Sequence, residues 1–295
     1  MGFESYHPMI NFLYFAAAII CAIWFNHPVF AAIAWLCAFV FSVKRNGIRM
    51  LVGNICLLAA AFIYSGWYSY YHHFGVTKLR VNFIGNAITL EAVLYGLQRG
   101  ITVITVVMIM SCVFSVVSSD KVVYLFGRIS PKLSLFFSIL LRSIPKIKVR
   151  AEKIRLARAG IGKDISRGNI WKRIVNLTAV FSILITWISE EWIENSASMK
   201  SRGYSLKGRT AFSIYRFDNR DRFVVLLLFF CYTTIIMAAA LDQTHIYYSP
   251  EIIWNHMTFM SGFFYGAYAL FLMLPVILEL YGTWKHHKAA KEGVE

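Results

Sequence analysis

The sequence predicts an all-α membrane protein, with about six transmembrane helices and long amphipathic helices on the cytoplasmic side. Three observations support this fold class. Hydrophobic residues make up 58% of the 295-residue chain, and the mean hydropathy is +0.57. Charged residues make up only 15%, whereas soluble domains usually carry about 25%. Several apolar runs approach the roughly 20 residues that a helix needs to cross a bilayer.

Hydropathy indicates six membrane-spanning segments in chain order. They cover about residues 10–26, 29–43, 50–67, 93–117, 223–241 and 257–281. The first two are joined by a tight turn at 26–28, and the basic loop KRNGIR (44–49) follows the second. A polar stretch at 68–88 separates the third span from the fourth. We expect Pro275 to kink the last span, because proline removes a backbone donor and crowds the preceding turn.

The charge distribution orients these spans in the membrane. Residues 119–222 carry 21 of the 30 Lys and Arg but only 8 of the 15 Asp and Glu, a net +13 within a total of +15. Basic residues favour the cytoplasmic side of a membrane. We therefore expect both termini and residues 119–222 to be cytoplasmic in a multi-pass cell-membrane protein. Only Lys78 and Arg80 then lie in an outer loop.

The same features divide the chain into three consecutive parts of one integrated domain. Residues 1–118 form an N-terminal membrane part with four spans, and residues 119–222 form a basic cytoplasmic segment. Residues 223–295 contain two more spans and a short polar tail.

The basic segment contains a first helical pattern with an apolar stripe. Ser130-Pro131 is typical of an N-cap followed by proline at the first helical position, and we expect Pro145 to interrupt this helix. Gly160 and Gly162 supply a C-terminal stop. An apolar stripe begins next to this proline and lies within about 100° of the helix circumference; it consists of Ile144, Ile147, Ala151, Ile154, Arg158 and Ile161.

A second helical pattern covers about 171–201 and ends at Gly203. Its first half, 174–188, is apolar enough for the edge of a bilayer, but the following SEEWIENSASMK is not. We therefore predict a helix that passes from lipid into water without crossing. One face of it carries Leu184, Ile188, Trp192, Met199 and Arg202.

Each of these helices thus finishes with an arginine on its apolar face and a glycine just beyond. A single such arginine could simply extend to lipid headgroups. Two in matching positions favour a protein partner, because the guanidinium group suits bidentate pairing with a carboxylate at a partly dehydrated interface. Small neighbours, namely Ala157, Ala159, Ser201 and Gly203, would allow close approach.

Two long motifs carry a resemblance to a known family. RSIPKIKVRAEKIRLARAGIG (142–162) and ISEEWIENSASMKSRGYSLKGRT (188–210) together resemble the transmembrane (T) component of energy-coupling factor transporters, which include the cobalt-transport Q-type proteins. In that family R-x-I-P leads into a helix ending in an Ala-Arg-Gly-like triplet. A second helix ends in A-x-x-x-x-R-G-Y, commonly followed by a basic G-x-R-T. This chain has RSIP at 142–145, ASMKSRGY at 197–204 and GRT at 208–210.

The resemblance implies a non-enzymatic scaffold in an ATP-driven importer of a vitamin, another micronutrient or a metal ion. The implied partners are two cytoplasmic ATP-binding cassette ATPases and a substrate-binding membrane subunit, within the lipid bilayer. In this family the two helices cross, and each docks into one ATPase. By position, the second docking triplet is Ser201, Arg202 and Gly203, and the first is Ala157, Arg158 and Ala159.

The first triplet departs from the family pattern. Aligning EKI (152–154) with the usual Asp-Lys-Ile puts the family's Arg-Gly on Ile161-Gly162, with Arg158 three residues early. A rise of about 4.5 Å separates the two positions, which a long arginine side chain can largely cover. Either Arg158 docks from one turn back, or Ile161 makes an apolar contact. We favour Arg158, because its flanking alanines are small.

The residues themselves offer little chemistry for other functions. There is no G-x-x-x-x-G-K-[ST] loop for nucleotide binding, and we expect no catalytic residue, cofactor or metal site. The five cysteines lie within apolar runs, which is typical of reduced thiols. The alternative is a membrane-embedded enzyme acting on anionic lipid or isoprenoid phosphates. The apolar helix faces that interrupt the basic segment argue against a nucleic-acid partner.

Overall fold

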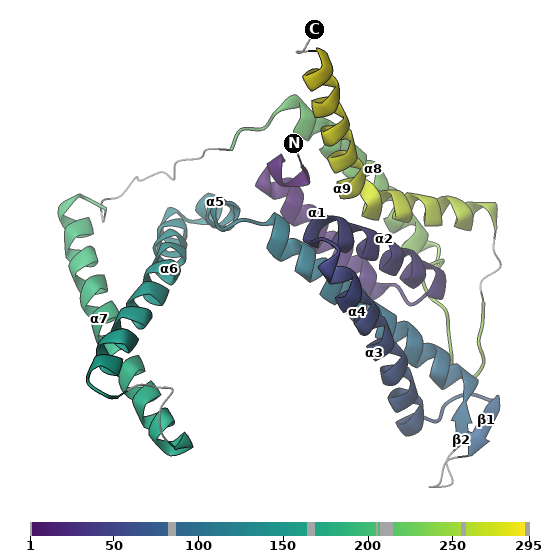
Figure 1. Ribbon diagram of the computed structural model, residues 1–295. Coiled ribbons are helices and arrows are strands. Elements are labelled where there is room, and N and C mark those ends of the chain that lie inside the picture. The colour runs from purple at the N-terminus through teal and green to yellow at the C-terminus, as the bar shows by residue number, and fades with distance from the viewer. Residues whose placement is uncertain are drawn as a thin grey trace. The chain divides into compact units, whose positions relative to one another are not determined.

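The computed structural model describes almost the whole chain, and most of it is helical (Figure 1). The described residues are 2–81, 87–163, 169–204, 206, 215–254 and 258–292. Two compact units can be separated: a membrane unit of Met1–Ser118 with Tyr215–Glu295, and a basic unit of Ser119–Ile214.

The elements of the two units follow the chain order. The membrane unit contains a 3-10 turn, η1 (Phe3–Ser5), then α1 (Pro8–Trp24), α2 (Pro28–Asn46), α3 (Arg49–Tyr71), the strands β1 (Lys78–Val81) and β2 (Ala87–Thr89), α4 (Leu90–Val116), α8 (Asn219–Ala240) and α9 (Phe259–Glu292). The basic unit contains α5 (Ser119–Ile129), α6 (Pro131–Gly160) and α7 (Ile170–Ser201).

Histidines begin the first two helices. In α1 and α2 a proline occupies the first turn, and the Nδ1 atoms of His7 and His27 accept the backbone N–H of Met9 at 3.3 Å and of Val29 at 3.2 Å. Burial lowers the pKa of His27 to about 4, so its ring stays neutral at physiological pH and can accept this bond. The tight turn predicted between the first two spans is therefore confirmed.

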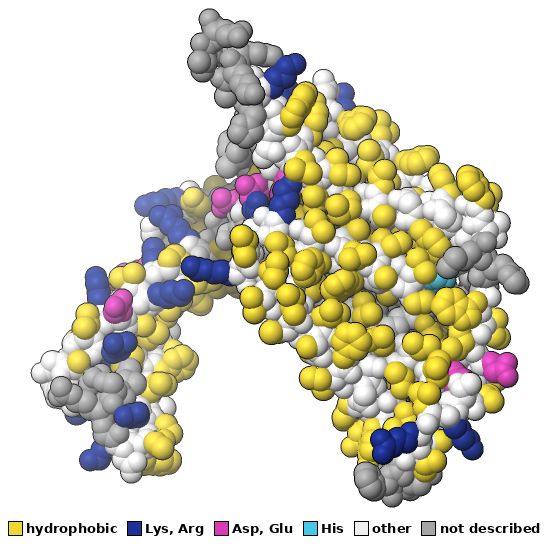
Figure 2. Space-filling model, turned by 45° about the vertical axis from the view of Figure 1, so that its right-hand side comes forward, with side chains coloured by type: hydrophobic (Ala, Val, Ile, Leu, Met, Phe, Trp, Pro, Cys, Tyr) yellow, Lys and Arg dark blue, Asp and Glu magenta, His cyan; other side chains and the backbone are white. Residues whose placement is uncertain are grey.

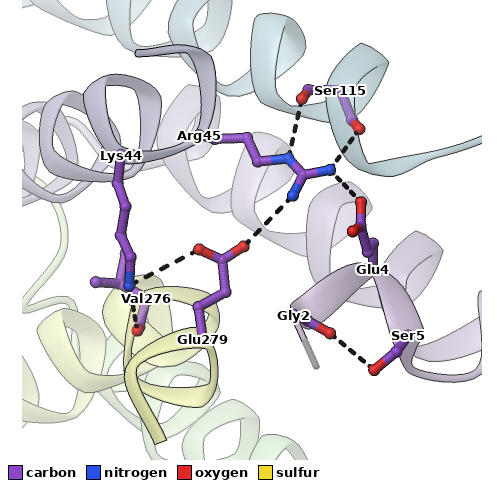
Figure 3. A network of polar contacts seen from close by, with 8 residues as sticks. All are labelled: Gly2, Glu4, Ser5, Lys44, Arg45, Ser115, Val276 and Glu279. Atoms are coloured by element: carbon purple, nitrogen blue, oxygen red, sulfur yellow. Dashed lines mark hydrogen bonds and ion pairs between the residues drawn. The ribbon is translucent and has the colours of Figure 1, made fainter. Parts of the chain in front are cut away.

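Polar residues collect at one end of the membrane unit (Figure 3). Near the end of α2, the Arg45 guanidinium bonds to Glu4 of η1, and its Nε lies 3.0 Å from the Ser115 hydroxyl near the end of α4. On α9, Glu279 lies between Arg45 at 3.9 Å and Lys44 at 3.8 Å. The Glu279 side chain is buried, with the residue 8% exposed, and the two cations compensate its charge.

A second polar cluster closes the opposite ends of these helices. Gln98, near the start of α4, donates to the Asn26 side chain between α1 and α2 at 3.2 Å and accepts the Tyr248 hydroxyl. Asn26 also pairs through its backbone with the segment after α8, its N–H lying 3.0 Å from the Thr244 carbonyl. The first cluster thus joins the start of α1 to the ends of α2 and α4, and the second lies at the opposite ends of these helices. Helices that cross a membrane in alternating directions require this arrangement.

Tight packing joins α3 to α4. A Cβ added at Gly96 would lie 3.2 Å from the Ser65 Cα, and one at Gly100 would lie 3.0 Å from the Ala61 carbonyl oxygen. Glycine at these two positions lets the backbones approach closely, as small residues commonly do between membrane helices.

Six helices in the described part are long and apolar enough to cross a membrane: α2, α3, α4, α7, α8 and α9. With its all-α architecture, this is a multi-pass membrane protein. The predicted set instead counted 10–26 and treated 171–201 as a helix that does not cross. The observed α1 has 17 residues, about 25 Å, and packs Phe15 and Ala18 into the core of the membrane unit. Hydrophobic side chains cover much of that unit in Figure 2.

Three further predictions need correction or refinement. Pro145 does not interrupt a helix: α6 is continuous from Pro131 to Gly160, because its second half is held by packing against α7. The stretch 68–88 is not simply polar loop, since α3 continues to Tyr71 and β1 pairs antiparallel with β2. Pro275 lies inside α9, which is bent as expected (Figure 1).

Candidate functional site

The basic unit is built on the packing of α6 against α7. Ile154 of α6 and Val180 and Leu184 of α7 are buried in a small core, and Ile147, Ala151 and Ile188 pack around it. The central part of the predicted α6 stripe is therefore confirmed. Its ends were wrong: Ile144 is 51% exposed and Ile161 69% exposed. Two crossing helices share only a few turns, so residues beyond the crossing have nothing to pack against.

Charged contacts flank this core. The Glu191 carboxylate of α7 accepts a hydrogen bond from Arg150 of α6 and lies 3.5 Å from the Lys146 ammonium. The Arg150 guanidinium also lies over the Trp187 ring, 5.1 Å from its centroid. These contacts fix the register of the two helices and were not predicted from the sequence.

The two helices run in opposite directions. Arg158, at the end of α6, bonds to Asn176 near the start of α7, whereas Leu135 and Ile139 near the start of α6 line a cleft with Met199 near the end of α7. Figure 1 shows the two helices crossing. From Ile139 to Arg158 the rise along α6 is about 28 Å. The two predicted docking triplets therefore lie at opposite ends of the helix pair.

The C-terminal end of α7 places Arg202 in a defined turn. Ser201 is the last helical residue, Arg202 is the C-cap, and Gly203 has a φ of +77°. The Gly203 N–H donates to the Lys200 carbonyl at 3.1 Å, and the next N–H reaches the Met199 carbonyl at 3.2 Å. This is the Schellman motif, which requires the left-handed conformation that glycine adopts easily. It leaves the Arg202 side chain exposed.

The end of α6 repeats this backbone arrangement with a different residue at the cap. Ile161 is the C-cap and Gly162 has a φ of +76°. The Gly162 N–H donates to the Ala159 carbonyl at 3.0 Å, and the Lys163 N–H donates to the Arg158 carbonyl at 3.0 Å. In backbone terms, Ile161-Gly162 is therefore the counterpart of Arg202-Gly203.

Arg158 is turned toward the partner helix. One of its terminal nitrogens, Nη2, lies 3.3 Å from the Asn176 side-chain oxygen, and the residue is half-buried. Its Nε is buried without an acceptor among the residues that the structure describes. Ala157 and Ala159 are both exposed. The signal that could have predicted this contact is Asn176, the one amide side chain in the largely apolar stretch 174–188 of α7.

A cleft of about 320 Å³ lies beside the end of α7. It is lined by Leu135 and Ile139 of α6, and by α7 residues that include Trp192 and Met199. The sequence placed these last two on the apolar face of α7. Trp192 is 44% exposed, so its ring borders an open surface. The end of α7 therefore combines an exposed guanidinium with a partly apolar hollow.

Three further features of the predicted site are the GRT motif, possible metal ligands and the surface charge. The basic motif GRT at 208–210 lies outside the described residues. Within the described ranges, no group of three or more His, Cys, Asp or Glu residues could hold a metal ion. Lys and Arg side chains are prominent on the helices of the basic unit in Figure 2. The basic unit thus has exposed surfaces of positive charge.

Comparison with known proteins gives one informative match. No protein-family model matches the chain. The curated protein called energy-coupling factor transporter transmembrane protein EcfT, from Bacillus selenitireducens, is 32% identical to it over 108 residues. This match covers 36% of the present chain and 40% of that protein's length. The name of that protein agrees with the resemblance carried by the two helix-end motifs and with the helical membrane architecture. The chain is therefore similar to EcfT over about two fifths of that protein's length.

Proposed function

We propose that this chain is the transmembrane scaffold of an energy-coupling factor importer, which couples two cytoplasmic ATP-binding cassette ATPases to a substrate-binding membrane subunit. The observation that carries the proposal is the antiparallel pair α6–α7. Its two helices end in the same capping turn, at opposite ends of one packed unit. Such an arrangement can engage two separate partners at once.

In this proposal the end of α7 docks through Ser201, Arg202 and Gly203. The exposed guanidinium can pair with a carboxylate of one ATPase, and the small flanking residues let the partner approach. The end of α6 docks on the second ATPase through Ala157, Arg158 and Ala159. Ile161 is the alternative contact there, since it occupies the cap position and is exposed.

Coupling in this scheme is mechanical. ATP binding and hydrolysis would occur in the partner subunits and displace the ends of α6 and α7. Because Ile154, Val180 and Leu184 join the helices, while Glu191 bridges them by charge, the pair would move as one body. The imported solute would be a vitamin, another micronutrient or a metal ion, selected by the separate binding subunit. Both termini and the basic unit would face the cytoplasm.

Purification from native membranes tests this function directly. The full-length chain, carrying an affinity tag, is solubilised in mild detergent, and the co-purified proteins are identified by mass spectrometry. We expect two ATP-binding cassette ATPases and a small membrane subunit at stoichiometric amounts. Arg202→Ala is the matched variant for comparison: it should lower ATPase recovery without changing membrane insertion. Recovery of the chain without any ATPase under conditions that preserve other membrane complexes would contradict the proposal.

A further inference from the structure

A long apolar groove runs between α1 and α8 in the membrane unit. Its volume is about 600 Å³, and every side chain that lines it is apolar or aromatic. Along α1 it extends from Met9 to Ile20, a rise of about 16 Å. This equals about half of the roughly 30 Å hydrocarbon thickness of a bilayer. The groove therefore has the length of one leaflet.

The groove offers no free hydrogen-bonding group along its walls. Its one hydroxyl, that of Tyr232, donates to the Leu13 carbonyl at 3.0 Å and so holds α8 to α1. Large apolar side chains remain uncovered there: Leu13 is 52% exposed and Phe229 is 66% exposed. An occupant made only of hydrocarbon would cover them without leaving a polar atom unpaired.

Positive charge marks one end of the groove. Arg222 lies three residues before Val225 and seven before Phe229, so it continues the same face of α8 as these two lining residues. Arg216 precedes Phe217, which also lines the groove. Both arginines are exposed.

The acidic residues nearby are engaged elsewhere. The Asp221 carboxylate is buried and accepts the backbone N–H groups of His7 at 3.5 Å and Asp218 at 3.1 Å. Asp218 in turn pairs with Arg220 at 3.3 Å. The charge presented at this end of the groove is therefore positive.

We propose that this groove binds an anionic phospholipid, with one acyl chain along α1 and α8 and the phosphate against Arg222 and Arg216. Both helices begin at this end, as shown by the His7 and Phe217 rings, whose centroids are 5.2 Å apart. The lipid therefore comes from the leaflet on the side where α1 starts, and its headgroup lies at the interface, where basic side chains attract anionic lipids. The proposal is independent of the coupling function.

Native mass spectrometry of the full-length protein tests the site. The protein is delipidated in detergent and given equal amounts of dioleoyl phosphatidylglycerol and dioleoyl phosphatidylcholine. We expect the wild type to retain the anionic lipid about five-fold over the neutral one. Arg222→Gln should remove this preference. Arg220→Gln is the matched control: it changes the same charge two residues away on another face, where the arginine pairs with Asp218, and should keep the preference.

Two further arms address the groove itself. Ala16→Phe, which fills the groove, should reduce retention of both lipids several-fold. A photo-crosslinking residue at Phe12 should yield an adduct with the mass of a phospholipid. Equal losses with Arg220→Gln and Arg222→Gln would mean general charge attraction and overturn the proposal. So would unchanged lipid retention in Ala16→Phe, or a protein-sized adduct at Phe12, which would identify a protein as the occupant.

Discussion

The ends of α6 and α7 share one backbone design but present different side chains. In both, a glycine with φ near +77° follows the cap residue and closes a Schellman motif. The cap of α7 is the exposed Arg202, whereas the cap of α6 is Ile161. The arginine of α6 lies three residues earlier and bonds to Asn176. The capping turn that ends a helix therefore does not determine whether the cap residue is charged. The two proposed ATPase contacts need not be chemically alike.

The largest expected effect concerns the sidedness of both helix ends. Single cysteines at Lys163 and Leu206, just beyond α6 and α7, should be protected from a membrane-impermeant thiol reagent in intact cells. A cysteine at Glu251, between α8 and α9, should be labelled completely. The background must lack the five native cysteines. Labelling at Lys163 or Leu206 before lysis would place that helix end outside and remove it from any cytoplasmic docking role.

Arg202→Ala should weaken the contact at the end of α7 by roughly 2–5 kcal/mol, because a buried carboxylate of the partner loses its counter-charge. Arg202→Lys should also be poor, since an ammonium group cannot supply a bidentate fork. The measurement is the amount of ATPase recovered with the tagged chain. Lys200→Ala, two residues earlier at the same helix end, is the control for lost positive charge. If both variants lower recovery equally, the contact depends on general charge and not on the guanidinium group.

The end of α6 requires a three-way comparison. Arg158→Ala should lower ATPase recovery by an amount corresponding to about 2 kcal/mol, as loss of a hydrogen bond from a charged group does. Asn176→Ala removes the intramolecular partner but leaves the arginine, so recovery should be retained. Equal losses with these two variants would show that Arg158 only holds α6 to α7. Loss with Ile161→Ala alone would transfer the docking role to the apolar cap.

The smallest effect is expected from the two capping glycines. Gly162→Ala and Gly203→Ala each force a Cβ into a left-handed conformation, which costs about 1 kcal/mol. The cost should be slightly larger at Gly203, where the new Cβ would lie 3.2 Å from a methyl carbon of Leu206. Thermal unfolding in detergent measures the difference. Gly203→Asn should be milder than Gly203→Ala, because asparagine tolerates this conformation better. An inverted order would argue against the capping turn.

The features that the sequence predicted well are those set by local chemistry. Long apolar runs can satisfy their backbone hydrogen bonds only as helices in a membrane, so hydropathy located these segments to within a few residues. Gly162 and Gly203 ended their helices as expected, because few other residues adopt positive φ without strain. Charged and apolar periodicity also identified Ile147, Ala151 and Ile154 as the packed face of α6.

The features that it did not predict depend on partners distant in the sequence. Pro145 is tolerated within α6 because α7 supports the helix, and nothing near residue 145 signals this support. Arg150 and Glu191 are 41 residues apart, so their ion pair follows only from the crossing. The direction of the Arg158 side chain likewise depends on Asn176. Local patterns placed these residues on a helix face but could not choose their neighbours.

The N-terminal segment of the membrane unit contacts both places where the chain passes to and from the basic unit. Glu4 bonds to Arg45, which also holds Ser115, three residues before the boundary at Ser118. His7 donates its backbone N–H to Asp221, and its ring packs on Tyr215, where the chain returns. A fusion partner that displaces these few N-terminal residues would therefore weaken the contacts at both points where the chain passes between the two units. For labelling or tethering, an attachment that displaces Glu4 and His7 would therefore disturb both passages of the chain.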